Sequence, residues 1–311
     1  MCQWALLSCV LVFATQAAAQ QPPVAADLPA SYRGGDIDHA LSAHAWDRAE
    51  KALATAIERA PASPALLEIL GRVFLIDRKP LNAAIAFKKA EAIRPIDDRT
   101  RFALVLAYVS LNHGDWARPE LDRLAAADPA NPTYQYWLGR LDYDAGQYGS
   151  AIDRFERAVA RDPGFVRAYD NLGLCYEALN QSDQALAHYR KAVALNRQAA
   201  PKSPWPPLNL AILLRNLGSA RDAEALLREA AGYEDGLPQV HYQLGVLLEQ
   251  EGRLDEAVAE LTRATSRDAA YAEPHYALAR VYRRLGRAAD ASAALAAFEK
   301  LHDTKGNAHP Q

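Results

Sequence analysis

The chain has little cysteine, few aromatic residues and no excess of basic charge. Of its 311 residues only three are cysteines and 8% are aromatic, and the formal net charge is −3. Because no excess of basic residues is left to neutralise phosphates, nucleic acid is not expected as the main partner, and a polybasic membrane-binding patch is equally unsupported. Half of the residues are hydrophobic, and alanine, leucine, arginine and glutamate are abundant, which favours helices that pack through small side chains. Composition therefore predicts an all-helical protein.

Motifs that carry catalysis or bind metals are missing from the sequence. It contains no H-E-x-x-H, no paired Cys-x-x-Cys, no glycine-rich phosphate loop and no Gly-x-Ser-x-Gly elbow. The eight histidines are scattered through the chain. We therefore predict that the chain is not an enzyme, binds no cofactor and has no metal site.

The N-terminus has the features of an export signal. Residues 5–14 are almost wholly apolar, and three alanines that end at Ala19 give an A-x-A-type cleavage site before Gln20. The apolar run is too short to span a bilayer stably, and no later stretch is long enough. We predict a signal peptide over residues 1–19, cleaved near Ala19. The mature protein should then be periplasmic or secreted, without an integral membrane segment.

The cysteines add to this interpretation. Cleavage would remove Cys2 and Cys9, so that Cys175 would be the single thiol of the mature chain and no intramolecular disulfide could form. The sequence that ends in Cys9 resembles the lipobox of bacterial lipoproteins but comes too early in the chain, so a lipoprotein is disfavoured. Cys175 lies between Leu174 and Tyr176 without the positive surroundings that a reactive thiol needs, and we predict a buried packing residue.

A period of 34 residues organises the rest of the chain. The repeats begin near Ala30, Pro64, Asp98, Pro132, Val166, Pro204, Pro238 and Ala272. The fifth repeat is four residues longer than the others, and the excess falls in residues 198–203. Each repeat keeps an alanine at the same place in its second half, at Ala49, Ala83, Ala117, Ala151, Ala185, Ala223, Ala257 and Ala291. A Leu-Gly or Leu-Ala pair, such as Leu70-Gly71 or Leu172-Gly173, recurs in one register in the first half of six repeats.

At these offsets the sequence resembles the tetratricopeptide repeat (TPR) family. The resemblance implies an all-α fold, an α-solenoid of about eight helix-turn-helix units that form a right-handed superhelix. The physical reason for the spacing is that glycine or alanine leaves a hole on one helix, into which a large side chain of its partner helix fits. We predict the array over residues 30–303, after a flexible linker at 20–29 and before a disordered tail at 304–311.

The two ends of the array are predicted to be weaker than its middle. Gly34-Gly35 stands where the first helix of the first repeat should run, so that helix should be short. The turns that contain Gly114, Gly146 and Gly252 should end their first helices with a left-handed glycine. Nothing after Leu301 resembles a polar capping helix, so the last hairpin should be uncapped and offer a surface for self-association.

The resemblance also implies where a partner protein or extended peptide would bind. First helices line the concave groove, and the side chains at five fixed places of each repeat point into it. The predicted groove residues at these places are Arg99, Phe102, Tyr136, Arg140, Tyr143, Arg167, Trp205, Arg215, Tyr242, Tyr276, Arg280, Arg283 and Arg284, and Asp170, Glu177 and Glu249 share the pattern. Asn171 and Asn209 are added from the sixth place of two consecutive repeats, where other family members use an asparagine ladder to grip the peptide backbone. Arginine and large aromatic residues are frequent interface anchors. The lysine and asparagine pattern with which some family members hold a C-terminal carboxylate does not occur.

We interpret the chain as a non-catalytic scaffold of the cell envelope that mediates protein–protein or protein–peptide interaction through this groove. Two alternatives remain open. One is an envelope assembly or biogenesis factor for a pilus, a secretion system or an outer-membrane complex. The other is an accessory subunit of a polysaccharide or glycosyl-transfer system. The insertion before Trp205 is predicted to act as a joint or as an extra contact between repeats five and six.

Overall fold

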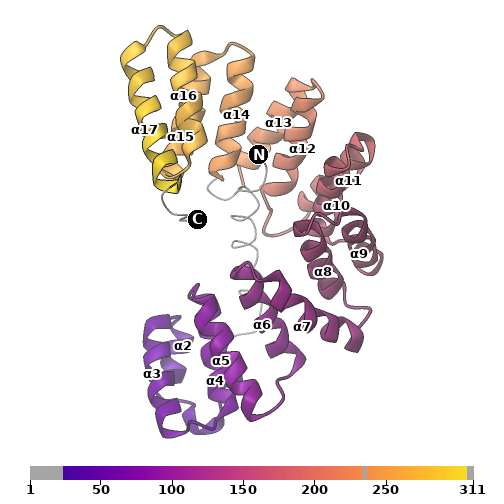
Figure 1. Cartoon of the computed structure of the whole chain (residues 1–311), viewed down its shortest axis with the longest axis vertical. Coiled ribbons are helices and arrows are strands. Elements are labelled where there is room, and N and C mark those ends of the chain that lie inside the picture. The colour runs from indigo at the N-terminus through magenta and orange to yellow at the C-terminus, as the bar shows by residue number, and fades with distance from the viewer. Residues whose placement is uncertain (1–23, 234–236, 307–311) are drawn as a thin grey trace. The chain divides into compact units, whose positions relative to one another are not determined.

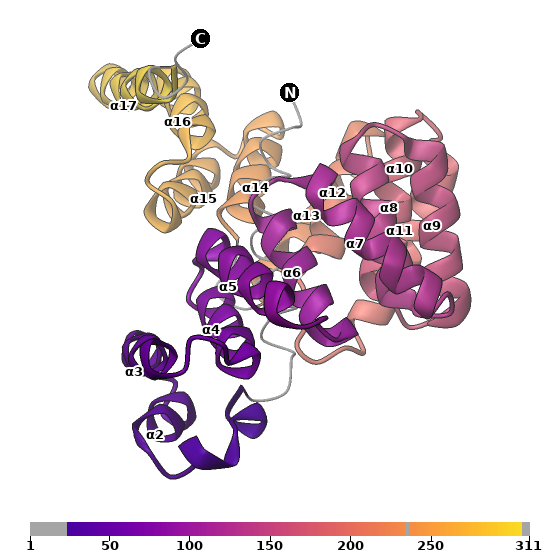
Figure 2. The same ribbon diagram turned by 60° about the horizontal axis from the view of Figure 1, so that its bottom comes forward.

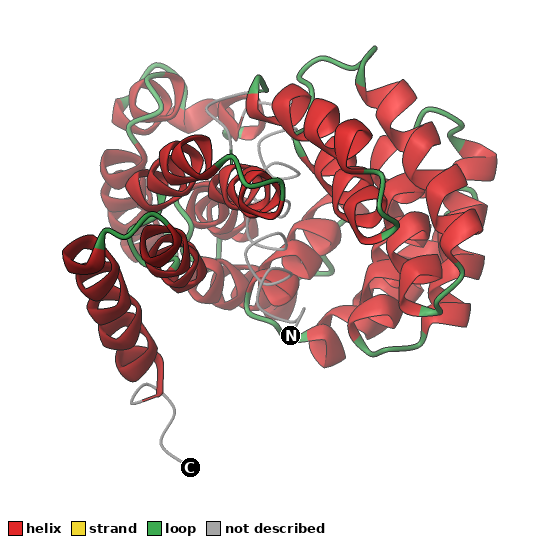
Figure 3. Ribbon diagram, turned by 90° about the horizontal axis from the view of Figure 1, so that it is seen from above, coloured by secondary structure: helices red, strands yellow, loops and turns green. Residues whose placement is uncertain are grey.

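The computed structural model describes residues 24–233 and 237–306, and all regular structure in these two ranges is helical (Figure 3). The predicted signal peptide and residues 20–23 of the predicted linker lie outside the described residues. Within the described ranges no helix is both long and apolar enough to cross a membrane. The chain divides into two compact units, residues 1–145 and 146–311, and each is described by itself.

Unit 1 is built from antiparallel helical hairpins (Figures 1 and 2). Two short 3₁₀ helices, η1 and η2, precede the hairpins α2/α3, α4/α5 and α6/α7, and α8 ends the unit. Their bounds are η1 Val24–Asp27, η2 Ala30–Tyr32, α2 Asp36–Ser42, α3 Trp46–Arg59, α4 Pro64–Ile76, α5 Pro80–Ile93, α6 Asp98–Ser110, α7 Gly114–Ala127 and α8 Pro132–Asp144.

Unit 2 continues the same alternation, from α9 through the hairpins α10/α11, α12/α13, α14/α15 and α16/α17. The bounds are α9 Tyr148–Arg161, α10 Val166–Ala178, α11 Ser182–Asn196, α12 Trp205–Asn216, α13 Ala220–Ala231, α14 Pro238–Gln250, α15 Leu254–Arg267, α16 Ala272–Arg284 and α17 Ala288–Gly306. From α4 onward the first helices begin within one residue of the predicted repeat starts. The predicted α-solenoid of helical hairpins is confirmed.

Close approach of glycine to a large side chain locks several hairpins. A Cβ added to Gly71 would lie 2.5 Å from Cε1 of Phe87, and one added to Gly245 would lie 2.6 Å from Cγ of Leu261. Phe87 and Leu261 are themselves fully buried. These are the pairs that the repeat register predicts, because the small residue of the first helix faces the large residue of the second. Side-chain size therefore fixes the distance between the paired helices.

The turn within each hairpin places one residue in the left-handed region. It is the fifteenth residue of each repeat, and in the second half of the array it is glycine except at Asn180. The prediction for Gly114 was wrong, because the left-handed residue of that turn is Asn112, with φ +60°, and Gly114 is the first residue of α7. Asparagine tolerates this conformation better than most residues, which explains why the turn needs no glycine there.

Ordered structure extends beyond the predicted bounds of the array at both ends. Residues 24–28 are not a flexible linker, because η1 packs on the first hairpins and Leu28 is buried in their core beside Ile37 and Leu66. The first helix, α2, is short, as predicted from Gly34-Gly35. At the other end, α17 continues to Gly306, past the predicted end of the array at residue 303.

Two hydrogen bonds close the insertion between α11 and α12. The buried side chain of Asn196 donates through Nδ2 to the carbonyl oxygen of Ser203 at 2.7 Å, and its Oδ1 accepts from the Ser203 amide at 2.8 Å. Asn196 ends α11, and Trp205 begins α12. One side chain thereby satisfies both backbone groups of Ser203 and holds the ends of the longer connection together.

Candidate functional site

In each unit the first helices of consecutive hairpins form one continuous surface, which we call the first-helix face. It comprises α4, α6 and α8 in unit 1 and α10, α12, α14 and α16 in unit 2. Side-chain contacts join neighbouring first helices, for example Phe102 to Tyr134, with ring centroids 5.6 Å apart, and Arg215 to Gln243 by a hydrogen bond. The predicted groove residues lie on these helices.

Two arginines on the first-helix face of unit 1 hold one carboxylate. The Nη1 atoms of Arg72, on α4, and Arg99, on α6, lie 2.9 and 2.8 Å from the same oxygen of Asp27. Arg72 is buried, and burial lowers the pKa of its guanidinium while the Asp27 charge raises it. The segment that precedes the first hairpin is thereby bound across two repeats by charge-assisted hydrogen bonds.

The remaining predicted residues of unit 1 are packed against their neighbours. Tyr136 and Arg140 are buried, and the guanidinium of Arg140 lies 3.1 Å from a carboxylate oxygen of Asp144 and 5.4 Å from the ring centre of Tyr143. Cation–π contact and ion pairing thus fix the direction of the Arg140 side chain.

A carboxylate organises the first-helix face at the C-terminal end of unit 2. Buried Glu249, on α14, accepts from Nε of Arg280 at 2.7 Å and from its Nη2. Arg284 donates to the backbone oxygen of Glu249 at 2.7 Å. Arg280 also lies 5.9 Å from the ring centre of Tyr276, whose side chain is 47% exposed. Together with exposed Arg283, this end of the face has three arginines to one buried glutamate.

Arg215 lies on the same face of unit 2, but its hydrogen-bond partners are neutral amides. Its guanidinium donates to the amide oxygens of Gln243 and Asn216, which are neutral acceptors, and no carboxylate of the described residues forms an ion pair with it. Burial lowers its pKa. Tyr242, packed edge-on against Tyr271 at 5.4 Å, has a pKa raised by burial. A half-buried cation beside an aromatic ring suits a carboxylate from outside the chain.

The other predicted residues of unit 2 make contacts within the chain. Asn171 donates to the carbonyl oxygen of Arg167 on its own helix at 2.8 Å, and Asn209 donates to Asp170 at 3.0 Å. The guanidinium of Arg167 lies 5.8 Å from the ring centre of Phe165. Trp205 is buried. The Asn209 hydrogen bond therefore joins α12 to α10, whereas the Asn171 hydrogen bond lies within α10.

Three side chains that contribute to the first-helix faces were not predicted from the sequence, namely those of Arg72, Gln243 and Asp27. Arg72 has the ninth place of its repeat, as Arg140 and Arg280 have in theirs, so the repeat register could have identified it. Gln243 has the sixth place of its repeat, as the predicted Asn171 and Asn209 have in theirs, so the register could have identified it too. Asp27 precedes the first repeat, and nothing in the 34-residue pattern refers to it. Only the folded chain shows the Asp27 contact.

One acidic cluster outside the first-helix face already has a counter-charge. Asp47, Glu50 and Asp77 lie close enough to share a cation. The ammonium group of Lys79 is 3.7, 2.8 and 2.6 Å from their respective oxygens. The hydrogen bonds to Asp77 and Glu50 raise the pKa of Lys79, and the cluster is an ion-pair network of the first two hairpins.

Models of the tetratricopeptide repeat match residues 37–97, 138–204, 208–273 and 248–303, which is more than half of the chain. The chain belongs to the tetratricopeptide repeat family. Among curated proteins, this TPR chain is 25% identical over 224 residues to the peroxisomal targeting signal receptor of Kluyveromyces lactis. The match covers 60% of the TPR chain and 39% of the receptor. A second receptor of this name, from Candida glabrata, is 26% identical over 123 residues, which cover 40% of the chain and 20% of that receptor.

Solved structures support the same fold. Yeast Tom70 superposes with a TM-score of 0.67 over 94% of this chain and 65% of its own, at 18% identity. Cut9, in the hetero-tetramer of Cut9 and Hcn1, gives 0.63 over 74% of this chain and 45% of its own, at 15% identity. The type IV pilus biogenesis factor PilW superposes with a TM-score of 0.57 over 64% of this chain and 90% of its own, at 20% identity. The family and its relatives support a protein-interaction scaffold.

Proposed function

We propose that this TPR chain is an exported, non-catalytic scaffold that binds an extended acidic segment of a partner protein on its first-helix faces. One observation carries the proposal. The chain's own Asp27, which belongs to no hairpin, is bound by Arg72 and Arg99 from two consecutive first helices. The contact is an internal example of how this surface can hold a carboxylate from a segment that lies across it.

The first-helix face of unit 2 offers the same chemistry for a separate molecule. Arg215 has neutral hydrogen-bond partners, and Arg283 is exposed. Tyr276 presents nearly half of its surface to solvent. Arginine and tyrosine bury large areas and make directed hydrogen bonds, so they often carry most of the energy of an interface. Two curated relatives are named as receptors for a targeting signal, which agrees with peptide binding.

A labelled peptide tests this assignment. An extended peptide with Asp and Glu between aromatic residues should bind the purified protein, and its Asn and Gln counterpart should bind more weakly. The double substitution Arg215→Gln and Tyr276→Ala should reduce the affinity for the acidic peptide about tenfold, because each removed contact contributes about 0.5–1 kcal/mol or more. Fluorescence anisotropy measures both dissociation constants.

The matched control for this experiment is Arg221→Gln. Arg221 is an exposed arginine on α13, a second helix, so its removal changes the net charge equally but leaves the first-helix face intact. Equal binding of the acidic and neutral peptides, or equal loss of affinity in the control and the double variant, would contradict the proposal.

The export part of the proposal rests on the sequence of residues 1–19. Expressed at native level in a bacterium with two membranes, the full chain should appear in the periplasmic or medium fraction with Gln20 as its new N-terminus. The Ala19→Asp variant should remain uncleaved, because signal cleavage requires a small residue at that place. N-terminal sequencing and cell fractionation give the answer, and an intact N-terminus in the wild-type chain would exclude the predicted processing.

The envelope assembly factor is a narrower form of this proposal. Its support is the fold that the chain shares with PilW, a pilus biogenesis factor, together with the predicted signal peptide. An envelope partner with an exposed acidic segment would suit the first-helix face of unit 2.

A further inference from the structure

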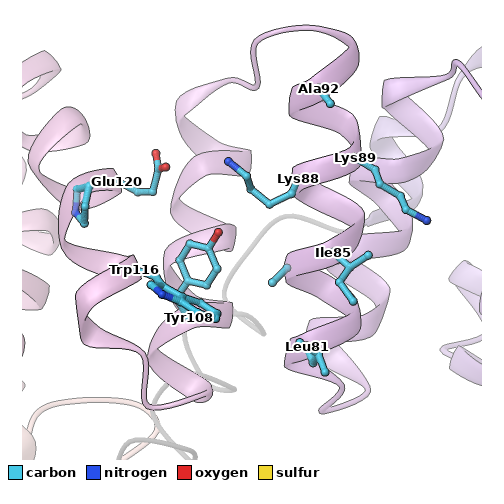
Figure 4. Close-up of a pocket in the computed structure, with 10 residues that line it drawn as sticks. Leu81, Ile85, Lys88, Lys89, Ala92, Tyr108, Trp116 and Glu120 are labelled. Atoms are coloured by element: carbon cyan, nitrogen blue, oxygen red, sulfur yellow. The ribbon is translucent and has the colours of Figure 1, made fainter.

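A second surface of unit 1 has the features of a binding groove. It lies between α5 and α7, the second helices of consecutive hairpins, and Tyr108 of α6 lines its floor (Figure 4). The cavity has a volume of about 790 Å³. We call it the outer groove. None of the predicted groove residues lies in it.

Large apolar side chains stand exposed along the outer groove. Leu81 and Ile85, one turn apart on α5, are 54% and 48% exposed, and Trp116 on α7 is 48% exposed. Isolated exposed apolar residues are common, but several that line one cavity indicate a surface that is covered in use. The outer groove therefore offers apolar contacts on both of its walls.

The tryptophan of the outer groove is held in place before anything binds. Its ring is stacked on His113, with centroids 3.8 Å apart and planes 5° from parallel, and meets Tyr108 edge-on at 5.6 Å. A side chain already fixed by its neighbours loses little rotamer entropy when a ligand covers it. The indole of Trp116 is thus arranged as an anchor.

One end of the outer groove carries excess positive charge. Ion pairs link Lys88 to Glu91, Glu91 to Arg101, and Arg101 to Glu120, and Arg123 lies 3.6 Å from Glu120. This network has three cations and two carboxylates, and exposed Lys89 also lines the groove. Lys88 extends from α5 across the groove (Figure 4). An acidic partner is favoured over a basic one.

The shape of the outer groove selects the form of the partner. The lining residues of α5 run from Leu81 to Ala92, which at 1.5 Å per residue is a length of about 16 Å, or three helical turns. A groove between two helices, with apolar side chains one turn apart, accepts the apolar stripe of a third helix. A flat bilayer would meet Leu81 and Ile85 but would not reach the floor at Tyr108.

We propose that the outer groove binds an amphipathic helix of a partner protein whose acidic residues flank its apolar stripe. The apolar stripe packs on Leu81, Ile85 and Trp116, and the acidic residues lie beside Lys88 and Lys89. The surface is separate from the first-helix faces, so this TPR chain would hold an extended segment and a helix by different sets of residues.

The test uses a synthetic amphipathic helical peptide with leucines at i, i+4 and i+7 and glutamates beside them. A counterpart with lysines in place of the glutamates is measured alongside. The protein should bind the acidic peptide, and Leu81→Ser with Ile85→Ser should weaken binding at least tenfold. Lys88→Gln should weaken it less and reduce its dependence on salt. Because all three side chains are about half exposed, the variants should fold, which circular dichroism verifies.

Matched controls separate the outer groove from general effects. Ile93→Ser removes an apolar residue of α5 that is 43% exposed but does not line the groove, and Lys51→Gln removes an exposed lysine on α3. Both should bind the helical peptide like the wild type. The groove variants should keep their affinity for the extended acidic peptide, so the two proposals fail separately.

Four results would overturn the outer-groove proposal. They are equal binding of the lysine peptide, wild-type affinity in the Leu81/Ile85 variant, binding to anionic phosphatidylglycerol vesicles in place of the acidic peptide, and self-association that the Leu81/Ile85 variant abolishes. The last two would assign the groove to a membrane or to a second copy of the chain.

Discussion

Replacement of Gly173 by leucine is expected to lower the free energy of unfolding by about 3 kcal/mol, at the upper end of the usual cost of overpacking. A Cβ at this position would lie 2.4 Å from Cδ1 and Cε1 of Tyr189. Tyr189 is fully buried, and its hydroxyl donates to Glu177 at 2.9 Å, so the ring cannot move aside without losing that bond. The α10/α11 hairpin must open, or a buried hydrogen bond must break.

Urea denaturation followed by circular dichroism measures this effect. Gly149→Leu is the control, because a Cβ at Gly149 meets nothing within 4 Å and the residue lies in the first turn of α9. Leucine has the better helix propensity, so the control should unfold at the wild-type urea concentration or slightly above it. A Gly173 variant as stable as the control would show that side-chain size at the helix crossing does not set the packing of the hairpins.

The hairpins could be predicted because their cause is local and repeated. The hole at Gly71 or Gly173 and the large side chain at Phe87 or Tyr189 are 16 residues apart and recur with a fixed period, so the sequence displays them directly. The turns were predicted less well. A left-handed residue is needed at the fifteenth place of each repeat, but asparagine can supply it, and Gly114 was therefore misassigned.

Contacts between distant segments could not be predicted in this way. Asp27 lies 45 residues from Arg72 and 72 residues from Arg99, and no periodic pattern connects them. The linker prediction failed for the same reason, since the burial of Leu28 depends on a core made by later residues. The outer groove was missed because family resemblance directs attention to first helices, whereas Leu81 and Trp116 belong to second helices.

The two binding proposals share one physical feature, which is positive charge in excess of its local counter-charges. The net charge of the whole chain is slightly negative, so composition alone gave no sign of it. On the first-helix face of unit 2, Arg215 donates to neutral amides and Arg280 pairs with a single carboxylate. A slightly negative overall charge therefore does not exclude local acidic ligands.

Replacement of Asp27 by arginine is expected to increase the affinity of unit 1 for the acidic extended peptide about thirtyfold. The substitution removes the carboxylate that occupies Arg72 and Arg99 and places a third cation beside them. Charge-assisted hydrogen bonds contribute about 1.5–3 kcal/mol each. Because the Asp27 side chain is 35% exposed and so partly screened by solvent, we expect its two hydrogen bonds to contribute roughly 2 kcal/mol together. Because Asp27 competes from within the chain with that strength, it lowers the affinity of the site for an external ligand about thirtyfold.

Anisotropy titrations in the Arg215→Gln and Tyr276→Ala background isolate this effect, because unit 2 then contributes little binding. Hydrogen exchange of residues 24–33 should rise in the same variant as the segment leaves the face. Asp122→Arg, at an exposed position on α7, makes the same change in net charge and should alter neither measurement. If Asp27 serves only to cap the array, the Asp27→Arg variant will unfold at lower urea with an unchanged peptide affinity, and the assignment of Arg72 and Arg99 as a ligand site will be wrong.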